Sequence, residues 1–461
     1  MAEEEKPNEA PILTEYTEDH IRHLSDMEHI RTRPGMYIGK LGDGSHAEDG
    51  IYVLLKEVID NSIDEFKMNA GRRIEITVED NLRVSVRDYG RGIPLGKLIE
   101  AVSMLNTGGK YDSKAFKKSV GLNGVGVKAV NALSSHFEVR SHRDGEMRRA
   151  TFERGILTGE STEPTADENG TFIYFEPDCA LFKNYTFRTE FIETMLRNYT
   201  YLNTGLTIMF NGRRIHSRNG LVDLLNDNMT NDGLYPIIHL KGEDIEIAFT
   251  HTGQYGEEYY SFVNGQHTTQ GGTHQSAFKK HIAETIKDFS GKNFDYGDIR
   301  NGLVAAIAVN IEEPLFESQT KIKLGSLTTI PDGGISIDKF VGDFVKEQVD
   351  NYLHKNTDIA DIIIQKITEN EKERTRGNLL RAVSHDLRTQ VLALGLDGVH
   401  RTAKMRVGTV AGGKRRQFDA RKAHGFHVLI KRDEIVLQLQ LVVTPGGAAQ
   451  QHGIIAFGQT V

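Results

Sequence analysis

The sequence predicts an α+β fold in which helices cover one face of a sheet. Residues 51–66 (IYVLLKEVIDNSIDEF) place apolar side chains on one face of a helix and polar side chains on the opposite face. Residues 74–88 alternate between apolar and polar on both sides of Asp80-Asn81, which is typical of a β-hairpin. Together these patterns predict a sandwich whose second sheet face is less fully covered. Further strands are predicted at 136–142, 149–155, 171–178 and 206–215.

The segment before this region predicts a first helix. Residues 17–39 (TEDHIRHLSDMEHIRTRPGMYIG) begin with Thr17, which can cap a helix, and contain Pro34-Gly35, which would end it.

A second region begins near residue 236 and mixes strands with longer helices. The apolar run 302–309 (GLVAAIAV) predicts a buried strand and is far too short to span a bilayer. We predict strands at 237–242, 245–252, 259–265 and 302–311, a helix at 274–289, and a long amphipathic helix at 336–375.

Composition limits the class of protein. The 461 residues are enough for two or three domains with ample core. Cys179 is the only cysteine, so no disulfide can form within the chain, and this usage fits a reducing cytosol. The acidic, polar N-terminus lacks a basic segment leading into an apolar one, so we expect a soluble, cytoplasmic protein without a membrane partner. The formal net charge of −8 is uneven, because the chain is acidic up to about residue 375 and basic after it.

The polar face of the predicted helix carries Glu57, Asn61 and Asp64 at spacings of i, i+4 and i+7. A solvated surface would also explain these residues. The glycine-rich segments that follow, RDYGRGIP (87–94) and SVGLNGVG (119–126), favour a different interpretation. A carboxylate, an amide and two glycine turns of phosphate size together suggest a nucleotide site.

Asp88 is a candidate for recognition of the base. It ends its strand with the parity of Val84 and Val86, so its side chain should point to the core. A buried carboxylate needs hydrogen bonds, and the exocyclic amine of adenine is a suitable donor. The alternative is a structural Asp that caps the following turn. Gly92 would let a flat ring approach the backbone, because a Cβ there would obstruct it.

Residues 121–133 (GLNGVGVKAVNAL) place three glycines before a further helix. The free N–H groups and the dipole of such a helix can hold phosphate oxygens. A helix start with a flexible approach would show the same pattern. The order of polar helix, inward Asp and two glycine turns favours the nucleotide site.

These motifs resemble the GHKL ATPase family and, within it, the B subunits of bacterial type II topoisomerases, DNA gyrase and topoisomerase IV. The similarity extends from about Tyr16 to Glu373. RPGMYIG and QTK set this branch apart from the chaperone, mismatch-repair and histidine-kinase branches. The segments that carry the resemblance are RTRPGMYIG (31–39), KEVIDNSIDE (56–65), RDYGRGIP (87–94), NTGGKYD (106–112), SVGLNGVGVKAVNALS (119–134), NGTFIYFEPD (169–178), GGTH (271–274) and PLFESQTKIKLGS (314–326).

The resemblance implies a GHKL (Bergerat) ATPase sandwich followed by a ribosomal-protein-S5-domain-2-like transducer domain. It divides the chain into an N-terminal arm (1–22), an ATPase domain (23–235), a transducer domain (236–375) and an unassigned tail (376–461).

The resemblance also implies roles for individual residues, with ATP and Mg²⁺ as cofactors. Glu57 would be the general base that orients the attacking water, and Asn61 would bind Mg²⁺ through its side-chain oxygen. Asp88 would recognise adenine. Gln319 and Lys321 would reach the γ-phosphate from the transducer domain, so that the nucleotide state is felt across the domain boundary.

Further positions follow from the same resemblance. Tyr16 would lie on an arm that reaches the nucleotide of a partner protomer. Asn123 and Phe116 stand where many relatives have His and Tyr, so contacts of those side chains are not carried over. The base pocket would be shaped by Gly92, Pro94 and Thr171, with Glu65 placed to pair with Arg91. The lid over the phosphates would consist of Gly121, Leu122, Asn123, Gly124, Val125, Gly126 and Val127, with added charge from Lys110.

The family's activity is an ATP-operated gate. ATP binding would join two chains into a homodimer around double-stranded DNA, hydrolysis would reset the gate, and a DNA-cleaving A-type subunit would be the partner. The acidic EGDSA-type and DxD motifs of the family's cleavage domain do not occur in this sequence. We therefore expect this chain alone to hydrolyse ATP without relaxing or supercoiling DNA. Gyrase and topoisomerase IV are not separated by these motifs.

Beyond Glu373 a different pattern begins. Residues 374–389 (RTRGNLLRAVSHDLRT) resemble the phosphoacceptor box of a sensor histidine kinase, with His385 as the acceptor and Gln390 where a proline is expected. A kinase fragment is thus the alternative function, since histidine kinases share the GHKL nucleotide fold. A kinase carries its phosphoacceptor helix before its ATP domain, whereas His385 follows it here, and this order favours the topoisomerase interpretation.

The rest of the tail resembles no family. Its basic segment GGKRRQFDARKAHG (412–425) could contact DNA phosphates, and VLQLQLVV (436–443) could form one strand. A truncated or chimeric reading frame would also explain the change in charge and the missing cleavage domain.

Overall fold

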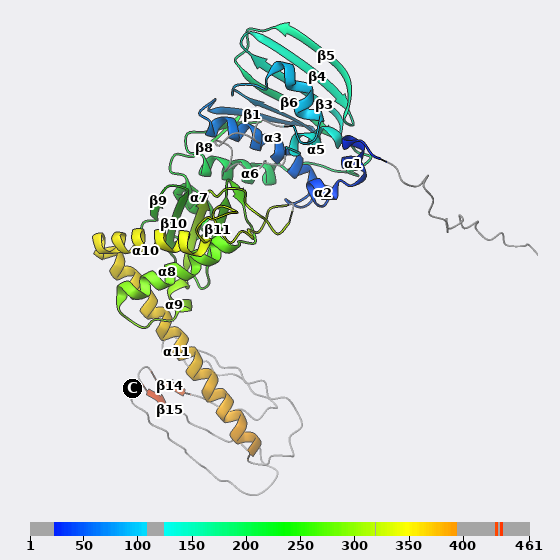
Figure 1. Ribbon diagram of the computed structural model, residues 1–461. Coiled ribbons are helices and arrows are strands. Elements are labelled where there is room, and N and C mark those ends of the chain that lie inside the picture. Colours follow the sequence, from blue (N-terminus) through cyan, green and yellow to red (C-terminus); the bar gives the residue numbers. More distant parts are fainter. Residues whose placement is uncertain (1–22, 108–123, 319, 394–428, 432–433, 437–461) are drawn as a thin grey trace, which may run out of the picture. The chain divides into compact units, whose positions relative to one another are not determined.

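The computed structural model describes residues 23–107, 124–318, 320–393, 429–431 and 434–436 (Figure 1). The chain divides into two compact units, Met1–Thr375 and Arg376–Val461. The first unit contains an eight-stranded and a five-stranded sheet with their helices. No helix among the described residues is long and apolar enough to cross a membrane.

The eight-stranded sheet has the order β5-β4-β3-β6-β2-β1-β7-β8 and is antiparallel except where β1 pairs with β7. The predicted hairpin is confirmed, with Asp80 and Asn81 at φ of 51° and 57° in its turn. Strand β5, whose side chains are almost all exposed, was not predicted, because an edge strand without a buried face lacks alternation. The strands are β1 (Arg73–Glu79), β2 (Arg83–Asp88), β3 (Ser134–Arg143), β4 (Glu146–Glu153), β5 (Ile156–Pro164), β6 (Gly170–Pro177), β7 (Thr207–Phe210) and β8 (Arg213–His216).

Helices cover one face of this sheet, with α3 across its centre (Figure 1). Helix α3 buries Ile51, Leu55 and Ile59 completely, as its apolar face predicts. The helices of this part are α1 (Asp26–Thr32), α2 (Gly35–Ile38), α3 (Gly50–Lys67), α4 (Leu98–Ser103), α5 (Gly126–Ala132) and α6 (Thr189–Leu202), and a 3-10 turn, η2 (Leu95–Lys97), precedes α4.

The predicted N-terminal helix differs from the observed one. Helix α1 begins at Asp26 and not near Thr17, because Ser25 and Glu28 form a reciprocal capping box at that point. Helix α1 ends at Thr32, just before Pro34, as predicted, and a second short helix, α2, follows directly after Pro34. Thr17 itself lies outside the described residues.

The five-stranded sheet has the order β12-β11-β13-β10-β9 and is covered on both faces. Ala248 and Phe262 pack with helix α7 (Leu221–Asn228), whereas Ile247 and Phe249 share a core with α8 (Thr273–Ser290) and the later helices. This double burial explains the apolar run of β13. The strands are β9 (Ile238–Lys241), β10 (Ile245–His251), β11 (Glu258–Val263), β12 (Gln266–His267) and β13 (Leu303–Val309), and a short helix α9 (Tyr296–Arg300) precedes β13.

The single long helix predicted at 336–375 is wrong in one respect. Helix α10 (Ile337–Lys355), capped by Ser336, ends at Asn356, whose backbone leaves the helical region at φ −125° and ψ 66°. Helix α11 (Thr357–Ala393) then starts anew and continues past Thr375. The domain boundaries proposed from the sequence stay predictions.

In the second unit the structure describes the later part of α11 and one hairpin. Strands β14 (Leu429–Lys431) and β15 (Glu434–Val436) pair antiparallel. The alternating segment 436–443, predicted as a strand, lies outside the described residues after Val436.

Candidate functional site

Helix α3 is the central element of the candidate site, and its polar face is not a solvated surface. The Glu57 side chain is 13% exposed, and Asp64 is buried. Other elements of the fold cover these polar side chains, so a position on a solvent-facing helix surface does not explain them. The solvated-surface interpretation of this helix face is wrong.

Glu57 lies between two elements far from it in sequence. Its Oε1 is 3.5 Å from Nζ of Lys321, which follows β13 in the five-stranded part of the unit. On the other side, a Cβ at Gly126 would come within 1.9 Å of Glu57 Oε2, so a side chain at the first residue of α5 would displace the Glu57 carboxylate. The sequence-predicted residues Glu57, Lys321 and Gly126 therefore meet at one place.

Lys321 is held in a strained backbone conformation. Its φ is +57°, in the left-handed region, and its N–H donates to Ser318 O at 3.0 Å. Such a conformation costs a non-glycine residue on the order of 1–3 kcal/mol and persists where the surroundings determine it. The local fold thus presents Lys321 to Glu57.

Asn61 lies one turn after Glu57 on α3. Its Nδ2 donates to the Glu57 carbonyl at 2.9 Å, which identifies Oδ1 as the atom that could take a hard cation. No cluster of three or more His, Cys, Asp or Glu in the described part of the chain could hold a metal ion. Asn61 would therefore be a single protein ligand of Mg²⁺, and phosphates and water would supply the other ligands.

Asp88 ends β2 and is 6% exposed. Its Oδ1 accepts from the backbone N–H of Gly90 at 2.9 Å and of Thr171 at 3.2 Å, and Ser62 Oγ donates to Oδ2 at 3.4 Å. Burial raises the pKa of Asp88 above its ordinary value, against the lowering effect of these backbone donors. The structural interpretation of Asp88 as a turn cap is confirmed, and Oδ2 retains capacity for a further donor.

The turn after Asp88 is held by a second carboxylate of α3. Arg91 donates through Nε and a terminal nitrogen to the two oxygens of Glu65 at 3.0 and 2.7 Å, and its backbone N–H donates at 2.9 Å. The predicted pairing of Glu65 with Arg91 is therefore present. This forked geometry fixes the turn against the helix.

Gly92 has a structural requirement in addition to the predicted approach of a flat ring, which stays a prediction. Its φ is +75°, and a Cβ would lie 2.7 Å from His142 O, so the protein's own β3 excludes a side chain there. Pro94 precedes the short turn η2 at Leu95–Lys97. Thr171 lies on β6 beside the end of β2 and is tied to it through Asp88.

The glycine-rich lid is only partly described. Gly124 has φ +60°, and Val125, Gly126 and Val127 start helix α5. Tyr16, Lys110, Gly121, Leu122, Asn123 and Gln319 lie outside the described residues. His385 is exposed on α11 in the second unit.

Sequence reasoning missed a second polar stripe on α3. Lys56, Asp60 and Lys67 lie beside Glu57 and Asn61, at spacings of i, i+4 and i+11. Asp60 contacts Lys56 at 3.9 Å and accepts from Gln266 Nε2 at 3.1 Å, and Lys67 Nζ donates to Asn264 O at 3.2 Å. The i, i+4 spacing was visible in the sequence, but the partners on another sheet were not.

Comparisons with known proteins agree with this geometry. Residues 46–180 match the family described as "Histidine kinase-, DNA gyrase B-, and HSP90-like ATPase", and residues 215–381 match "DNA gyrase B". The chain is 48% identical over 360 residues to the B subunit of DNA topoisomerase 4 from Borreliella burgdorferi, covering 78% of this chain and 59% of that protein. It is 33% identical over 398 residues to the B subunit of DNA gyrase from Thermotoga maritima, covering 78% of this chain and 60% of that one. The chain thus spans about three fifths of the length of these curated relatives.

Solved structures show the same similarity. The 43K ATPase domain of Thermus thermophilus gyrase B, in complex with an aminocoumarin, aligns with a TM-score of 0.60 at 26% identity, covering 78% of this chain and 98% of that one. The topoisomerase IV ATP-binding domain of Francisella tularensis aligns with a TM-score of 0.59 at 26% identity, covering 76% of this chain and 98% of that one.

Proposed function

We propose that this chain works as the ATP-operated gate of a type II topoisomerase. The chain belongs to the GHKL ATPases and contains the ATPase region of a type II topoisomerase of the gyrase B and topoisomerase IV B type. One observation carries the proposal. Lys321, from the part of the unit built on the five-stranded sheet, reaches Glu57 on α3 across 3.5 Å. A nucleotide at α3 can therefore influence, and be influenced by, that second part.

ATP, when bound, supplies the phosphoryl group that water attacks. In this proposal Glu57 accepts a proton from that water, while the Lys321 ammonium offers a positive charge beside developing negative charge. Asn61 would present Oδ1 to Mg²⁺, and Asp88 would accept from the adenine amine through Oδ2. Gln319 would assist Lys321 at the γ-phosphate.

The remaining residues would shape the site. Arg91 would stay fixed by Glu65 at the edge of the base pocket. The pocket walls would be Gly92, Pro94 and Thr171, the lid would be Gly121, Leu122, Asn123, Gly124, Val125, Gly126 and Val127, charge would come from Lys110, and Tyr16 would reach a partner's nucleotide.

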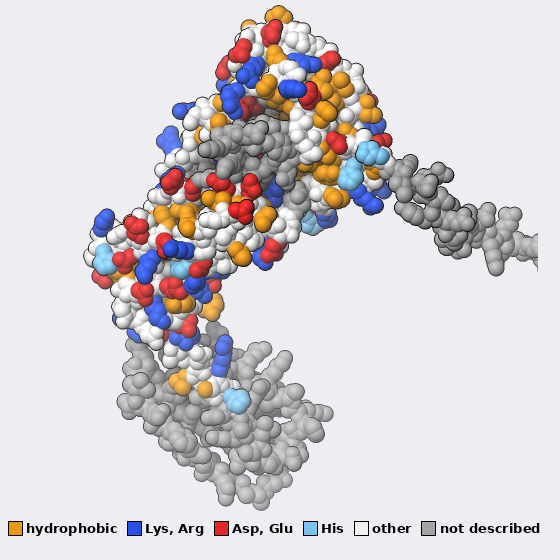
Figure 2. All heavy atoms as spheres, viewed as in Figure 1, with side chains coloured by type: hydrophobic (Ala, Val, Ile, Leu, Met, Phe, Trp, Pro, Cys, Tyr) orange, Lys and Arg blue, Asp and Glu red, His pale blue; other side chains and the backbone are white. Residues whose placement is uncertain are grey.

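We further propose the partners of the whole enzyme: double-stranded DNA, a DNA-cleaving A-type subunit, and a second copy of this chain on ATP binding. A DNA partner would place the protein in the cytoplasm. On the face shown in Figure 2, the described Lys and Arg side chains are interspersed with Asp and Glu.

The histidine-kinase alternative rests on the sequence pattern around His385. The match to DNA gyrase B extends through residue 381, just before His385. A phosphoacceptor role for His385 stays a prediction.

The test of this proposal is Lys321→Ala. ATP hydrolysis by the full chain should fall by about 10²-fold in kcat, which is the usual effect of removing one preorganised charge, while ATP binding is retained. Lys323→Ala is the matched control, because Lys323 lies two residues away and pairs at 2.9 Å with Glu317. Native hydrolysis by Lys321→Ala, or no ATP hydrolysis by the unaltered chain, would contradict the proposal.

Dimerisation is tested separately. A non-hydrolysable ATP analogue should convert the chain from monomer to dimer, and removal of residues 1–22 should abolish the dimer while nucleotide still binds. Light scattering that gives one mass with and without the analogue would contradict the gate but not the ATPase.

A further inference from the structure

Asp60 joins three elements that are distant in sequence. It lies on α3 between Glu57 and Asn61, and its side chain is 14% exposed. Tyr199 on α6 donates its hydroxyl to one Asp60 oxygen in a short hydrogen bond, and Gln266 on β12 donates to the other at 3.1 Å. Both donors are almost completely buried, so each would lose its acceptor without this carboxylate.

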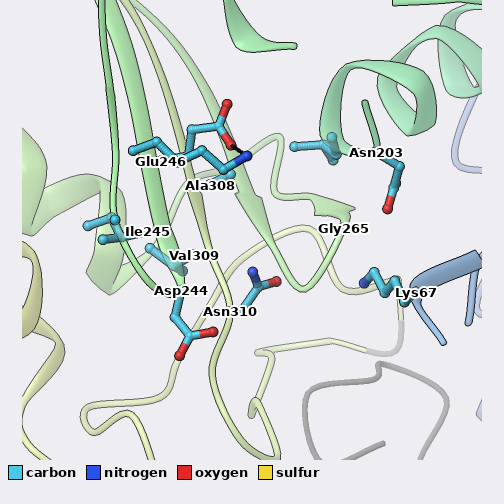
Figure 3. A pocket seen from close by; sticks show the side chains of 12 residues that line it. Lys67, Asn203, Asp244, Ile245, Glu246, Gly265, Ala308, Val309 and Asn310 are labelled. Atoms are coloured by element: carbon cyan, nitrogen blue, oxygen red, sulfur yellow. Dashed lines mark ion pairs between the residues drawn. The ribbon is translucent and has the colours of Figure 1, made fainter. Parts of the chain in front are cut away.

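The same hairpin is attached to α3 at a second point. Lys67 at the end of α3 donates to Asn264 O at 3.2 Å, in the turn between β11 and β12. Figure 3 shows Lys67 reaching towards the hairpin that carries Gly265, at the edge of a cleft whose other residues include Asp244 and Asn310. We call the contacts of Asp60 and Lys67 with the β11–β12 hairpin the α3 seam.

A backbone path leads from the seam to Lys321. Four residues after Gln266, the N–H of Gln270 donates to Ile322 O at 2.9 Å, and the N–H of Leu324 donates to Gly271 O at 3.1 Å. The segment that follows β12 is therefore paired with the residues directly after Lys321. A shift of the hairpin along α3 would move Lys321 relative to Glu57.

Charge balance at α3 depends on the same carboxylate. Lys56 lies 3.9 Å from Asp60, and its surroundings include both Glu57 and Lys321. Burial lowers the pKa of Lys56, and the like charge of Lys321 adds to this effect while Asp60 opposes it. Asp60 therefore offsets a second ammonium that would otherwise repel Lys321 and compete for Glu57.

We propose that Asp60 is a positioning residue that holds the β11–β12 hairpin against α3 and so sets the approach of Lys321 to Glu57. This inference rests on the proposed ATPase function for its kinetic consequences, but the geometry it describes exists without nucleotide. Gln266 is its counterpart on the other side of the seam.

The first experiment measures how available Lys321 is in the nucleotide-free chain. Wild-type, Asp60→Asn and Gln266→Leu proteins are treated briefly with an amine-acylating reagent, and labelling of Lys321 is quantified by mass spectrometry. Labelling of Lys321 should rise several-fold in both variants, because Lys321 is no longer held at Glu57. Unchanged labelling in both variants, with unfolding temperatures near that of the wild type, would overturn the proposal even if the chain proves not to be an ATPase.

A matched control is available within the same unit. Asp227 accepts a short hydrogen bond from the Tyr201 hydroxyl, which repeats the chemistry of Tyr199 and Asp60 away from the seam. Asp227→Asn should leave Lys321 labelling at the wild-type level. If Asp227→Asn raised labelling as much as Asp60→Asn, the effect would be general loosening, and the proposal would be wrong.

The second experiment is a double-mutant cycle on ATP hydrolysis. Asp60→Asn and Gln266→Leu should each lower kcat by about tenfold while KM for ATP changes little, since small misplacements of a catalytic group affect the rate most. In a Lys321→Ala background neither substitution should lower kcat further. Additive losses would show that Asp60 acts independently of Lys321.

Discussion

The two ends of the candidate site are built differently. At the Asp88 end, the polar groups come from neighbouring strands β2 and β6 and from α3, and backbone N–H groups of Gly90 and Thr171 hold the carboxylate. At the Glu57 end, the neighbouring cation comes from Lys321, beyond the second sheet. The first end is preorganised within one sandwich, whereas the second is complete only while two parts of the unit keep their relative position.

This difference suggests that the two ends of the site have different roles. A preorganised pocket fixes affinity, because its shape does not depend on distant contacts. A contact between two parts can couple the rate of a reaction to conformation. Substitutions at the Asp88 end should therefore change ATP affinity, and substitutions at the Glu57 end should change the rate of turnover.

The largest effect is expected at the Glu57 end. Glu57→Gln keeps the shape of the side chain but removes the base, so kcat for ATP hydrolysis should fall by about 10²-fold or more while ATP still binds. Glu75→Gln is the control, because Glu75 pairs with Arg73 on the exposed part of β1. Native turnover by Glu57→Gln would remove Glu57 from the mechanism.

A smaller effect, on affinity and not on rate, is expected at the Asp88 end. Asp88→Asn retains an acceptor for Gly90 and Thr171 but weakens a charge-assisted bond to adenine, so ATP affinity should fall by roughly 1.5 to 3 kcal/mol. Calorimetry measures the affinity, and the unfolding temperature reports whether the turn survives. Unchanged affinity in a folded variant would argue that Asp88 serves the fold alone.

The free energy of unfolding should depend on pH differently in the part built on the five-stranded sheet and at the Asp88 end. Burial lowers the pKa of His251 and of His267 to about 4, from an ordinary value near 6.5. Between these values the unfolded chain binds protons that the folded chain does not, so the free energy of unfolding should fall as pH falls from 6.5 to 4, by on the order of 2–3 kcal/mol per histidine. Thermal unfolding against pH should show this slope, and His267→Asn should reduce it.

The contribution of Asp88 to the free energy of unfolding should change with pH in the opposite direction. Because its pKa is raised, the folded chain binds its proton more tightly, so its contribution to stability declines as pH rises from 3.8 through the raised value. Protonation would also remove the charged acceptor, so ATP affinity should weaken on the acid side, and Asp88→Asn should flatten that profile. A wild-type affinity that is constant with pH would count against base recognition by this carboxylate.

The smallest effect is expected from the second unit. All described site residues belong to the first unit, so a chain ending at Ala393 should hydrolyse ATP at the rate of the full chain. The measurement is steady-state phosphate release by both proteins at equal concentration. A clear loss of turnover would show that residues after Ala393 contribute to the ATPase.

Local patterns were enough to predict the scaffold of the Asp88 end. The apolar face of α3 and the hairpin at Asp80-Asn81 follow from short-range periodicity and turn chemistry, and both are present. The inward direction of Asp88 followed from strand parity, and its burial agrees. Strand β5 escaped prediction, since neither of its faces is buried and alternation has no cause there.

Local sequence patterns were sufficient to identify the candidate site residues and the elements that carry them, because helix faces and strand parity depend on neighbours within a few positions. The contacts of those residues follow only from the packing of the whole unit. The close approach of Gly126 to the Glu57 carboxylate and the hydrogen bond from Gln266 to Asp60 depend on packing between segments far apart in the chain. Local periodicity carries no information about such partners, since two sheets can dock in many registers and only the complete core selects one.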